Sequence, residues 1–269
     1  MEKFESIFQK IDYVGMFLST EISSEVDIIN STELEFKNPL IVMGFVGAGL
    51  VGEIAVNHLI DQLNMREIAH IRSKHIPPSV VFVEGKLKNP FRIYSNNEGT
   101  LCTVICEVPL RSDSLYPLAS KILDWAENNK AKEVIVLEGL PVRGLPKKRP
   151  AFCASEPEKR KECEDKGIKM LSARIIISGI AGSILSGCLT RKITGVTFLT
   201  PAIAFMPDTE GAATLVDTLN KVYDLKVDTK KLLDQAADIK SRLKEIAQSY
   251  QKMRKDEDKR GASLDKLYT

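Results

Sequence analysis

The chain has 269 residues, with 38 lysines and arginines against 36 aspartates and glutamates, and a formal net charge of +2. Hydrophobic residues make up 43% and charged residues 28% of the sequence, which is typical of a globular protein rather than a disordered or fibrous one. This length allows one large domain, or one with a small appendage, to bury a sizeable core. The nearly neutral charge argues against a dedicated nucleic-acid-binding protein, which usually carries a strongly basic surface.

The cysteines, the first residues and one apolar run bear on the compartment. No C-x-x-C pair occurs, so paired zinc ligands and a disulfide framework are not indicated. Residues Met1–Glu5 carry acids where a signal peptide needs positive charge and an apolar stretch. The run Ile175–Thr190 has 16 residues including three glycines and three serines, whereas a membrane span needs about 20 residues. We expect a cytoplasmic protein. The cysteines are Cys102, Cys106, Cys153, Cys163 and Cys188.

Short apolar runs alternate with helical patterns from residue 39 to about residue 225, and together they predict the fold class. The predicted strands are Leu40–Met43, Glu67–Ile71, Val80–Val83, Phe91–Tyr94, Leu101–Val108, Glu133–Leu137 and Gly195–Thr200. The predicted helices are Leu50–Leu63, Leu115–Asn129 and Glu210–Tyr223. Continuous apolar strands that alternate with helices predict an α/β fold with a largely parallel sheet covered on both faces.

Residues 139–154 interrupt this alternation with prolines, glycines and a basic run. We expect a surface loop in which Arg143 and Lys147–Arg149 are solvated, because no aromatic side chains are interleaved for nucleic-acid binding. Ser155–Glu158 has capping-box spacing and predicts a short helix that ends at Gly167.

The segment Gly47–Gly52 has the spacing G-x-G-x-x-G directly after a predicted strand and at the start of a predicted helix. In a dinucleotide site such glycines let backbone N–H groups approach a pyrophosphate. The next strand should then end in an acid for the ribose, but Glu67 lies at its start and Arg72 near its end. The segment therefore predicts either a dinucleotide site or a tight turn in which glycines permit close packing of the helix on the sheet.

Other catalytic patterns are absent from the sequence. No Walker sequence G-x-x-x-x-G-K-[ST] and no G-x-S-x-G occurs. The histidines His58, His70 and His75 form no H-x₃-H pair or His–carboxylate cluster, so no metal site is indicated. We expect a protein that is not an enzyme and that uses no cofactor and no metal.

The C-terminal part of the chain has a different pattern. Apolar residues recur at alternating gaps of four and three residues, the a/d spacing of a coiled coil over three heptads. The pattern predicts an oligomerisation helix or, equally, a long amphipathic helix packed on its own domain. The following charged segment, Arg254–Lys266, predicts a solvated linker. The seam residues are Leu232, Ala236, Ile239, Leu243, Ile246, Tyr250 and Met253.

The chain ends in Leu267-Tyr268-Thr269, a hydrophobic residue followed by tyrosine and one further residue with a free carboxylate. The aromatic ring can fill a pocket while the carboxylate pairs with a lysine or with backbone N–H groups. A predicted linker after a predicted oligomerisation helix would present several such tails at once. We therefore predict three regions: a core domain over 1–226, a helix over 227–253, and a linker with a docking tail over 254–269.

Several blocks of the sequence resemble the proteasome assembly chaperone 2 family, and in particular the archaeal homologues of eukaryotic proteasome assembly chaperones. The resemblance spans about residues 10–240, and its blocks are Gly44–Leu59, Glu133–Pro141, Gly179–Leu185, Pro207–Ala213, Leu219–Lys221 and Val227–Thr229. It implies a nucleoside-phosphorylase-like α/β/α sandwich with a mixed, largely parallel sheet, and homo-oligomers without catalysis. It also implies that Leu267, Tyr268 and Thr269 dock between α subunits of the 20S proteasome core.

The resulting hypothesis is an ATP-independent assembly chaperone or activator of the proteasome core. Two alternatives stay open from the sequence: a dinucleotide- or nucleoside-binding enzyme that uses Gly47–Gly52, and a scaffold whose heptad helix recruits a different partner.

Overall fold

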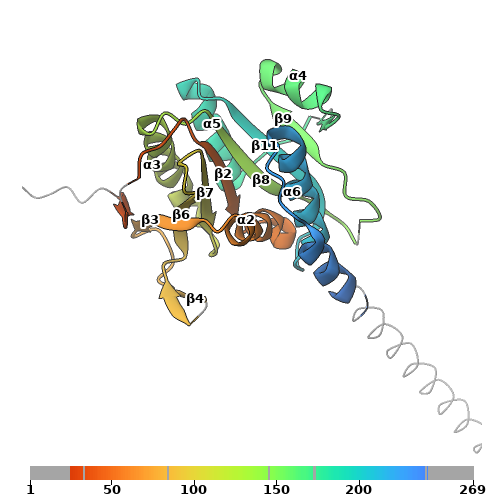
Figure 1. Ribbon diagram of the computed structural model, residues 1–269, viewed down its shortest axis with the longest axis horizontal. Coiled ribbons are helices and arrows are strands. Elements are labelled where there is room, and N and C mark those ends of the chain that lie inside the picture. The colour runs from red at the N-terminus through yellow and green to blue at the C-terminus, as the bar shows by residue number, and fades with distance from the viewer. Residues whose placement is uncertain are drawn as a thin grey trace, which may run out of the picture.

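The computed structural model describes residues 25–32, 34–83, 85–144, 146–171, 174–239 and 241, and its centre is a large β-sheet (Figure 1). Within these residues, nine strands pair in the order β1-β3-β6-β7-β2-β8-β11-β9-β10, while β4 and β5 form a separate hairpin. The strands are β1 Val26–Asn30, β2 Leu40–Phe45, β3 Arg66–Ser73, β4 Val81–Val83, β5 Lys86–Lys88, β6 Phe91–Ser95, β7 Leu101–Cys106, β8 Glu133–Val142, β9 Phe152–Ser155, β10 Lys169–Met170 and β11 Gly195–Ile203.

The centre of the sheet is parallel and its borders are mixed. Strands β7, β2, β8 and β11 run parallel to one another. On one side β6, β3 and β1 continue the sheet in antiparallel pairs, and on the other side β9 pairs antiparallel with β11 and parallel with β10. The predicted α/β fold with a mixed sheet is confirmed.

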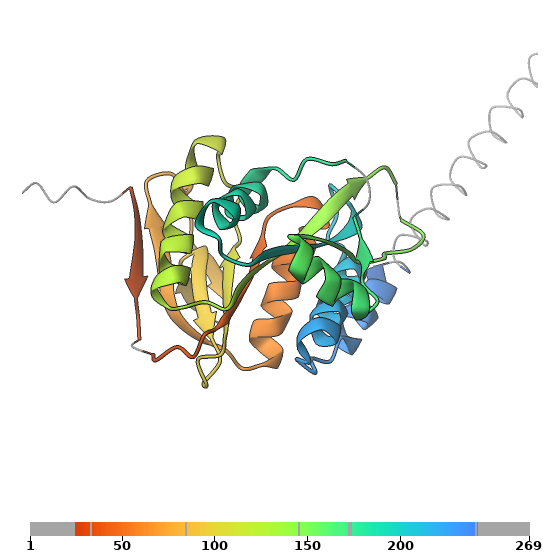
Figure 2. The same cartoon turned by 90° about the horizontal axis from the view of Figure 1, so that it is seen from above.

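Helices cover both faces of the sheet, so the molecule has three layers (Figure 2). Helices α2 (Val51–Gln62) and α6 (Thr209–Tyr223) pack together on one face. Helices α3 (Leu115–Asn128) and α5 (Gly179–Arg191) pack together on the other. The shorter helices are η1 Ala48–Leu50, η2 Ser112–Ser114 and α4 Pro157–Asp165. This arrangement is an α/β/α sandwich.

The continuous apolar run of β2 follows from its position between two parallel neighbours. Residues Leu40–Gly44 pair with β7 on one side and with β8 on the other. Val42 belongs to the hydrophobic cluster under α2 and α6, whereas Ile41 and Met43 belong to the cluster under α3 and α5. A strand that is covered on both faces needs apolar side chains at successive positions, which is why the sequence shows no alternation here.

Glycines bring the start of α2 against the sheet. A Cβ added to Gly52 would lie 2.2 Å from the carbonyl oxygen of Leu137 in β8, and one added to Gly44 would lie 2.2 Å from the carbonyl oxygen of Gly52. Both distances are far below contact between carbon and oxygen, so the helix can sit here only with hydrogen at these positions. Close packing is therefore one role of the glycine-rich segment.

We expect Gly52→Ala to destabilise the protein, because the new methyl group must displace the backbone of β8 or of α2. Overpacking of this kind costs about 1–3 kcal/mol or more. Urea unfolding measures the loss as a lower midpoint. Asn57→Ala on the same helix is the matched control, because it removes atoms without adding any in a half-buried position, and it should change the stability by less than about 0.5 kcal/mol. Equal midpoints for Gly52→Ala and the control would contradict the packing role.

The predicted loop over residues 139–154 is partly wrong. β8 extends to Val142 because Leu140–Val142 continue to pair with Pro201–Ile203 of β11, and Phe152–Ser155 form β9 on the other side of β11. The predicted capping box is also wrong: Ser155 lies in β9, and the N-cap of α4 is Glu156, which makes no side-chain capping bond. Gly167 does end this segment, with φ of +70°.

The apolar run Ile175–Thr190 contributes most of α5, whose residues Ile180, Ala181 and Ile184 are buried against the sheet and α3. In the part of the chain that the structure describes, no helix is both long and apolar enough to cross a membrane.

The chain after α6 packs back on the core. Asn220 holds the backbone of Val227 by two hydrogen bonds of 2.8 Å, and His58 Nε2 lies 2.6 Å from the carbonyl oxygen of Asp228. A helical segment over 230–239 follows, in which Leu232 and Ala236 are buried. The described part of the C-terminal helix is therefore anchored to the domain that precedes it.

Candidate functional site

The carboxyl ends of β7, β2, β8 and β11 meet at one edge of the sheet, which we call the carboxyl edge. The chain leaves β2 for α2 on one face and leaves β7 for α3 on the other, so the connections diverge here. In open α/β sheets, ligands bind at the carboxyl ends of strands where neighbouring connections diverge in this way. The segment Gly47–Gly52 lies at this edge, so we consider its chemistry first.

A carboxyl group faces the glycine turn. A Cβ added to Gly47 would lie 2.3 Å from Oε1 of Glu138, the half-buried residue that follows Leu137 in β8. This oxygen accepts a hydrogen bond of 3.0 Å from the backbone N–H of Gly139. Burial raises the pKa of Glu138 to about 7. A pyrophosphate bound at this turn would meet an acid, so the geometry favours the packing interpretation over a dinucleotide site.

The strand order also differs from that of a dinucleotide-binding unit. In such a unit the strand that follows the first helix lies beside the first strand. Here β3 follows α2 but is separated from β2 by β6 and β7. The acid of β3, Glu67, lies 3.3 Å from Lys88 Nζ and so pairs with the β4–β5 hairpin.

Further acids gather next to the glycine turn at the end of β7. Arg92 is buried in β6, donates a hydrogen bond of 2.8 Å to the Tyr94 hydroxyl and forms an ion pair with Glu107. Burial, followed by repulsion from Glu107, raises the pKa of Glu53 in the first turn of α2 to about 6. The carboxyl edge thus carries acids that become negatively charged when they lose their protons, and the Arg92 guanidinium beside them already pairs with Glu107, which disfavours phosphate or another anion.

The titration of Glu138 should make the stability depend on pH. Its pKa is raised from 4.5 to about 7 in the folded state, so the folded state binds the proton more strongly than the unfolded state. The free energy of unfolding therefore falls as the pH rises from about 4.5 to about 7. Glu138→Gln removes this penalty and should stabilise the protein by about 3 kcal/mol at pH 8 while changing little at pH 4.

Urea unfolding of the variant and the parent chain at both pH values measures this difference. Glu98→Gln, at an exposed position in a turn, is the control and should show the same small effect at pH 4 and pH 8. A Glu138→Gln effect that does not change with pH would show that this carboxyl group does not titrate in the expected range.

One side chain of the predicted basic loop is buried, contrary to expectation. Arg149 lies with Nε 2.8 Å from the carboxylate of Asp208 and with its terminal nitrogen 2.7 Å from Glu210, at the start of α6. Asp208 also accepts a hydrogen bond of 2.9 Å from the backbone N–H of Gly211 and so caps this helix. Arg149 therefore fastens the loop to α6, a role that a run of consecutive basic residues does not reveal.

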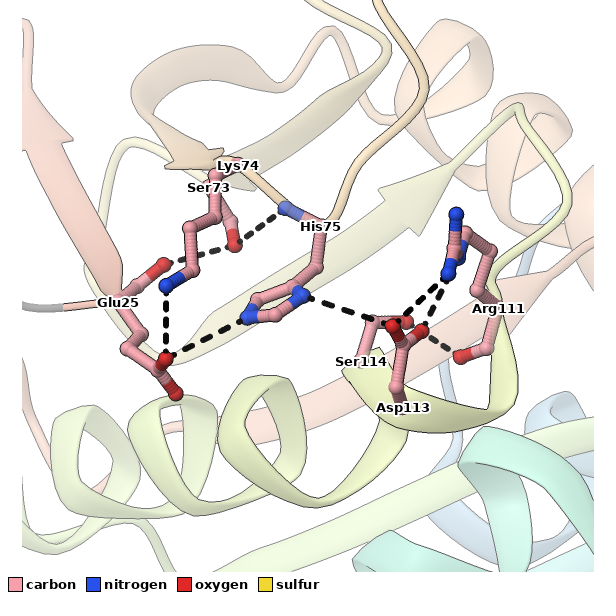
Figure 3. A network of polar contacts seen from close by, with 7 residues as sticks. All are labelled: Glu25, Ser73, Lys74, His75, Arg111, Asp113 and Ser114. Carbon is pink, nitrogen blue, oxygen red and sulfur yellow. Dashed lines mark hydrogen bonds and ion pairs between the residues drawn. The ribbon is translucent and has the colours of Figure 1, made fainter.

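A second polar network ties the edge strand β1 to the start of α3 (Figure 3). His75 lies between two carboxylates, with Nε2 3.7 Å from Glu25 and Nδ1 4.0 Å from Asp113. Lys74 pairs with Glu25 at 2.9 Å, and Arg111 pairs with Asp113 at 3.1 Å. Each acid already has a basic partner. The network therefore holds β1 to the start of α3. Among the described residues, no group of three His, Cys, Asp or Glu side chains could hold a metal ion.

Large apolar side chains are exposed at several places that the sequence patterns did not single out. On the β4–β5 hairpin, Phe82 and Leu87 form a cross-strand pair and are each about 70% exposed. On the rest of the surface, Ile176 and Phe205 are exposed by 91% and 96%. Apolar side chains exposed at separate places are ordinary on a protein surface, so by themselves they do not define a binding site.

The structure places some of the predicted site residues and not others. Leu232 is buried in the cluster under α2 and α6, Ala236 is also buried, and Ile239 is half-buried. The remaining seam residues Leu243, Ile246, Tyr250 and Met253 lie outside the described residues, and so do Leu267, Tyr268 and Thr269.

The fold and the carboxyl edge together define a three-layer α/β protein. Its glycine turn allows α2 to pack closely on the sheet. Comparison with known proteins then gives the family. The PAC2 family model matches residues 41–247 of the chain. The chain therefore belongs to the PAC2 family, the family that its sequence blocks resemble.

Solved structures agree with this assignment. A protein of unknown function from Thermoplasma acidophilum is 36% identical, with a TM-score of 0.70 over 83% of this chain and 91% of that one. Pyrococcus furiosus PbaA, described as an archaeal homologue of proteasome-assembly chaperone, is 26% identical, with a TM-score of 0.78 over 89% and 99%. Pyrococcus furiosus PbaB, described as an archaeal proteasome activator, is 21% identical, with a TM-score of 0.73 over 83% and 99%, and it shares the fold.

Proposed function

We propose that this protein is an ATP-independent proteasome assembly chaperone or activator that acts in the cytoplasm and catalyses no reaction of its own. The observation that carries the proposal is membership of the PAC2 family together with the likeness to PbaA along nearly its whole length. The carboxyl edge supports it as well, since Glu138 lies where a nucleotide phosphate would have to bind.

The proposed point of contact is the C-terminal tail, with the α subunits of the 20S core as partner. Leu267 and Tyr268 supply apolar surface and an aromatic ring, and Thr269 supplies the terminal carboxylate. Such a short anchor suits a narrow pocket with a cationic group at its base, because the ring fills the pocket and the carboxylate forms a charge-assisted hydrogen bond.

We also propose that the protein acts as a homo-oligomer, because several copies of a weak anchor bind far more tightly than one. Since Leu232 and Ala236 are buried against their own domain, they are not free to contact another copy. The seam residues left for self-association are Ile239, which is half-buried, and Leu243, Ile246, Tyr250 and Met253, together with the exposed apolar side chains of the domain surface.

An assembly experiment tests the function and separates its two forms. Full-length protein is added to separately purified α and β subunits of an archaeal 20S core, and in parallel to finished core particles. A chaperone increases the yield of core particles in the first mixture, and an activator increases the hydrolysis of a fluorogenic peptide in the second. Unchanged yield and unchanged hydrolysis, with protein that is folded by circular dichroism, would contradict the proposal.

A further inference from the structure

The β4–β5 hairpin carries an apolar face that the described part of the chain leaves open to solvent. The two strands pair with each other and not with the large sheet, and the hairpin stands out from the layered body (Figure 1). Phe82 and Leu87 lie opposite each other and are 71% and 70% exposed, and Val80, directly before β4, is 64% exposed. Because alternate residues of a strand share a face, these three side chains form one surface, which we call the hairpin face.

A two-stranded hairpin needs an element that covers its apolar face, because two strands alone are only marginally stable in water. The other side of this hairpin is turned toward the body: Lys88 Nζ lies 3.3 Å from Glu67, and both valines of β4 are half-buried. The hairpin face points away from these contacts. It also differs from the single exposed side chains Ile176 and Phe205, since its three members adjoin one another. The hairpin face is therefore the exposed apolar surface that most requires a partner.

The part of the chain that precedes the described residues joins the fold close to this hairpin. Val26, the first residue of β1, pairs with Ser73, the last residue of β3. Next to them, Glu25 Oε1 lies 2.9 Å from Lys74 Nζ (Figure 3). Residues 1–24 therefore enter β1 at the corner of the sheet where β3 ends and the connection to β4 begins.

The sequence of this preceding segment has the apolar pattern of an amphipathic helix. Over residues 4–18, large apolar residues recur at helical spacing along one stripe, and Glu5, Lys10 and Asp12 fall outside it. Such a stripe needs an apolar surface to pack on. A helix of this length would measure about 22 Å, and residues 19–24 could add an extended connection of about 20 Å, so the hairpin is within reach of Glu25. The stripe residues are Phe4, Ile7, Phe8, Ile11, Val14 and Leu18.

We propose that residues 4–18 pack their apolar stripe on the hairpin face of their own chain. The hairpin face needs a cover and the stripe needs a surface, and the short connection of residues 19–24 keeps the two close together. Such a tether gives an effective concentration of about millimolar, so contact within one chain outcompetes contact with a second copy at micromolar protein concentrations. The packed stripe supplies the second layer that a two-stranded hairpin needs. The hairpin face is then covered in the folded chain and is not available for self-association.

A photoreactive side chain in the hairpin face tests the proposal directly. Full-length Phe82→p-benzoylphenylalanine, irradiated as an equal mixture of unlabelled and ¹⁵N-labelled protein, should crosslink to residues 4–18. Both halves of each crosslinked peptide should carry the same label, because they come from one chain. Leu189→p-benzoylphenylalanine is the matched control: Leu189 is 60% exposed near the end of α5, which contacts β11, and it should not crosslink to residues 4–18. Mixed labels would assign the hairpin face to a second copy and would overturn the proposal, as would crosslinks only to other parts of the chain or no crosslinks at all.

Limited proteolysis of the full-length chain gives a second readout that does not depend on proteasome binding. Trypsin can cleave after Lys10, in the middle of residues 4–18, and packing on the hairpin should slow this cleavage. The double variant Phe82→Ser with Leu87→Ser removes the apolar contact and should speed the cleavage at least tenfold. Leu189→Ser, which removes an exposed leucine elsewhere, should leave the rate unchanged. All of these substitutions lie outside the hydrophobic core, so the variants keep the fold, and equal rates for the parent chain and the double variant would contradict the packing.

Discussion

Deleting Leu267–Thr269 should reduce binding of the protein to 20S core particles by at least two orders of magnitude. A three-residue anchor binds at about millimolar affinity by itself, or about −4 kcal/mol, and several anchors on one oligomer raise the avidity by about 10²–10⁴. The predicted linker Arg254–Lys266 would span roughly 20 Å as a flexible chain, enough to reach from an oligomer to an adjacent ring surface. Removing every anchor removes both the contact itself and the gain in avidity that several copies provide.

Point variants separate the parts of the anchor. Tyr268→Ala should weaken binding nearly as much as the deletion, because the ring supplies most of the buried area. Thr269→Ala is the matched control and should bind like the parent chain, since it keeps both the ring and the terminal carboxylate. Surface plasmon resonance with immobilised core particles measures all three. Full binding by the deletion variant would show that the tail is not the contact.

Lys159→Ala should destabilise the protein by about 3–5 kcal/mol, the cost of breaking a buried ion pair by removing one partner. Lys159 and Glu133 are almost wholly buried and lie 2.9 Å apart, and Glu133 also accepts a hydrogen bond of 2.6 Å from the Tyr223 hydroxyl. Without the lysine, the carboxylate of Glu133 stays in the core with its charge unbalanced. Chemical unfolding should show a much lower midpoint.

Two comparisons make this prediction specific. Arg160→Ala, on the same helix, removes an exposed pair with Glu164 and should cost less than about 1 kcal/mol. Combining Lys159→Met with Glu133→Gln should recover much of the loss, because an apolar chain and a neutral amide leave no buried charge. A Lys159→Ala variant as stable as Arg160→Ala would show that the buried pair contributes nothing net.

The parallel centre of the sheet was predictable because the hydrophobicity of its residues follows directly from their burial on both faces. Leu40–Met43 and Glu133–Leu137 are continuous apolar runs, and a strand covered on both faces has that pattern. Helices α3 and α6 repeat apolar residues at helical spacing for the same reason, since one face of each is buried. The glycine turn was predictable in position, but its two interpretations could be separated only by the distances from Gly47 to Glu138 and from Gly52 to Leu137.

Features that depend on distant partners could not be predicted. The burial of Arg149 follows from Asp208 and Glu210, some sixty residues later, and the extension of β8 to Val142 follows from its pairing with β11. The docking tail, by contrast, needs no distant partner within the chain. Its proposed role rests on the types of its residues and on their position at the end of the chain.

Co-sedimentation of the intact protein with purified archaeal 20S core particles tests the central claim most directly. We expect the full-length chain to sediment with the core in the absence of ATP and to be displaced by free C-terminal peptide in excess. Folded protein that stays in the supernatant at core concentrations well above micromolar would contradict the claim that this PAC2 protein acts on the proteasome.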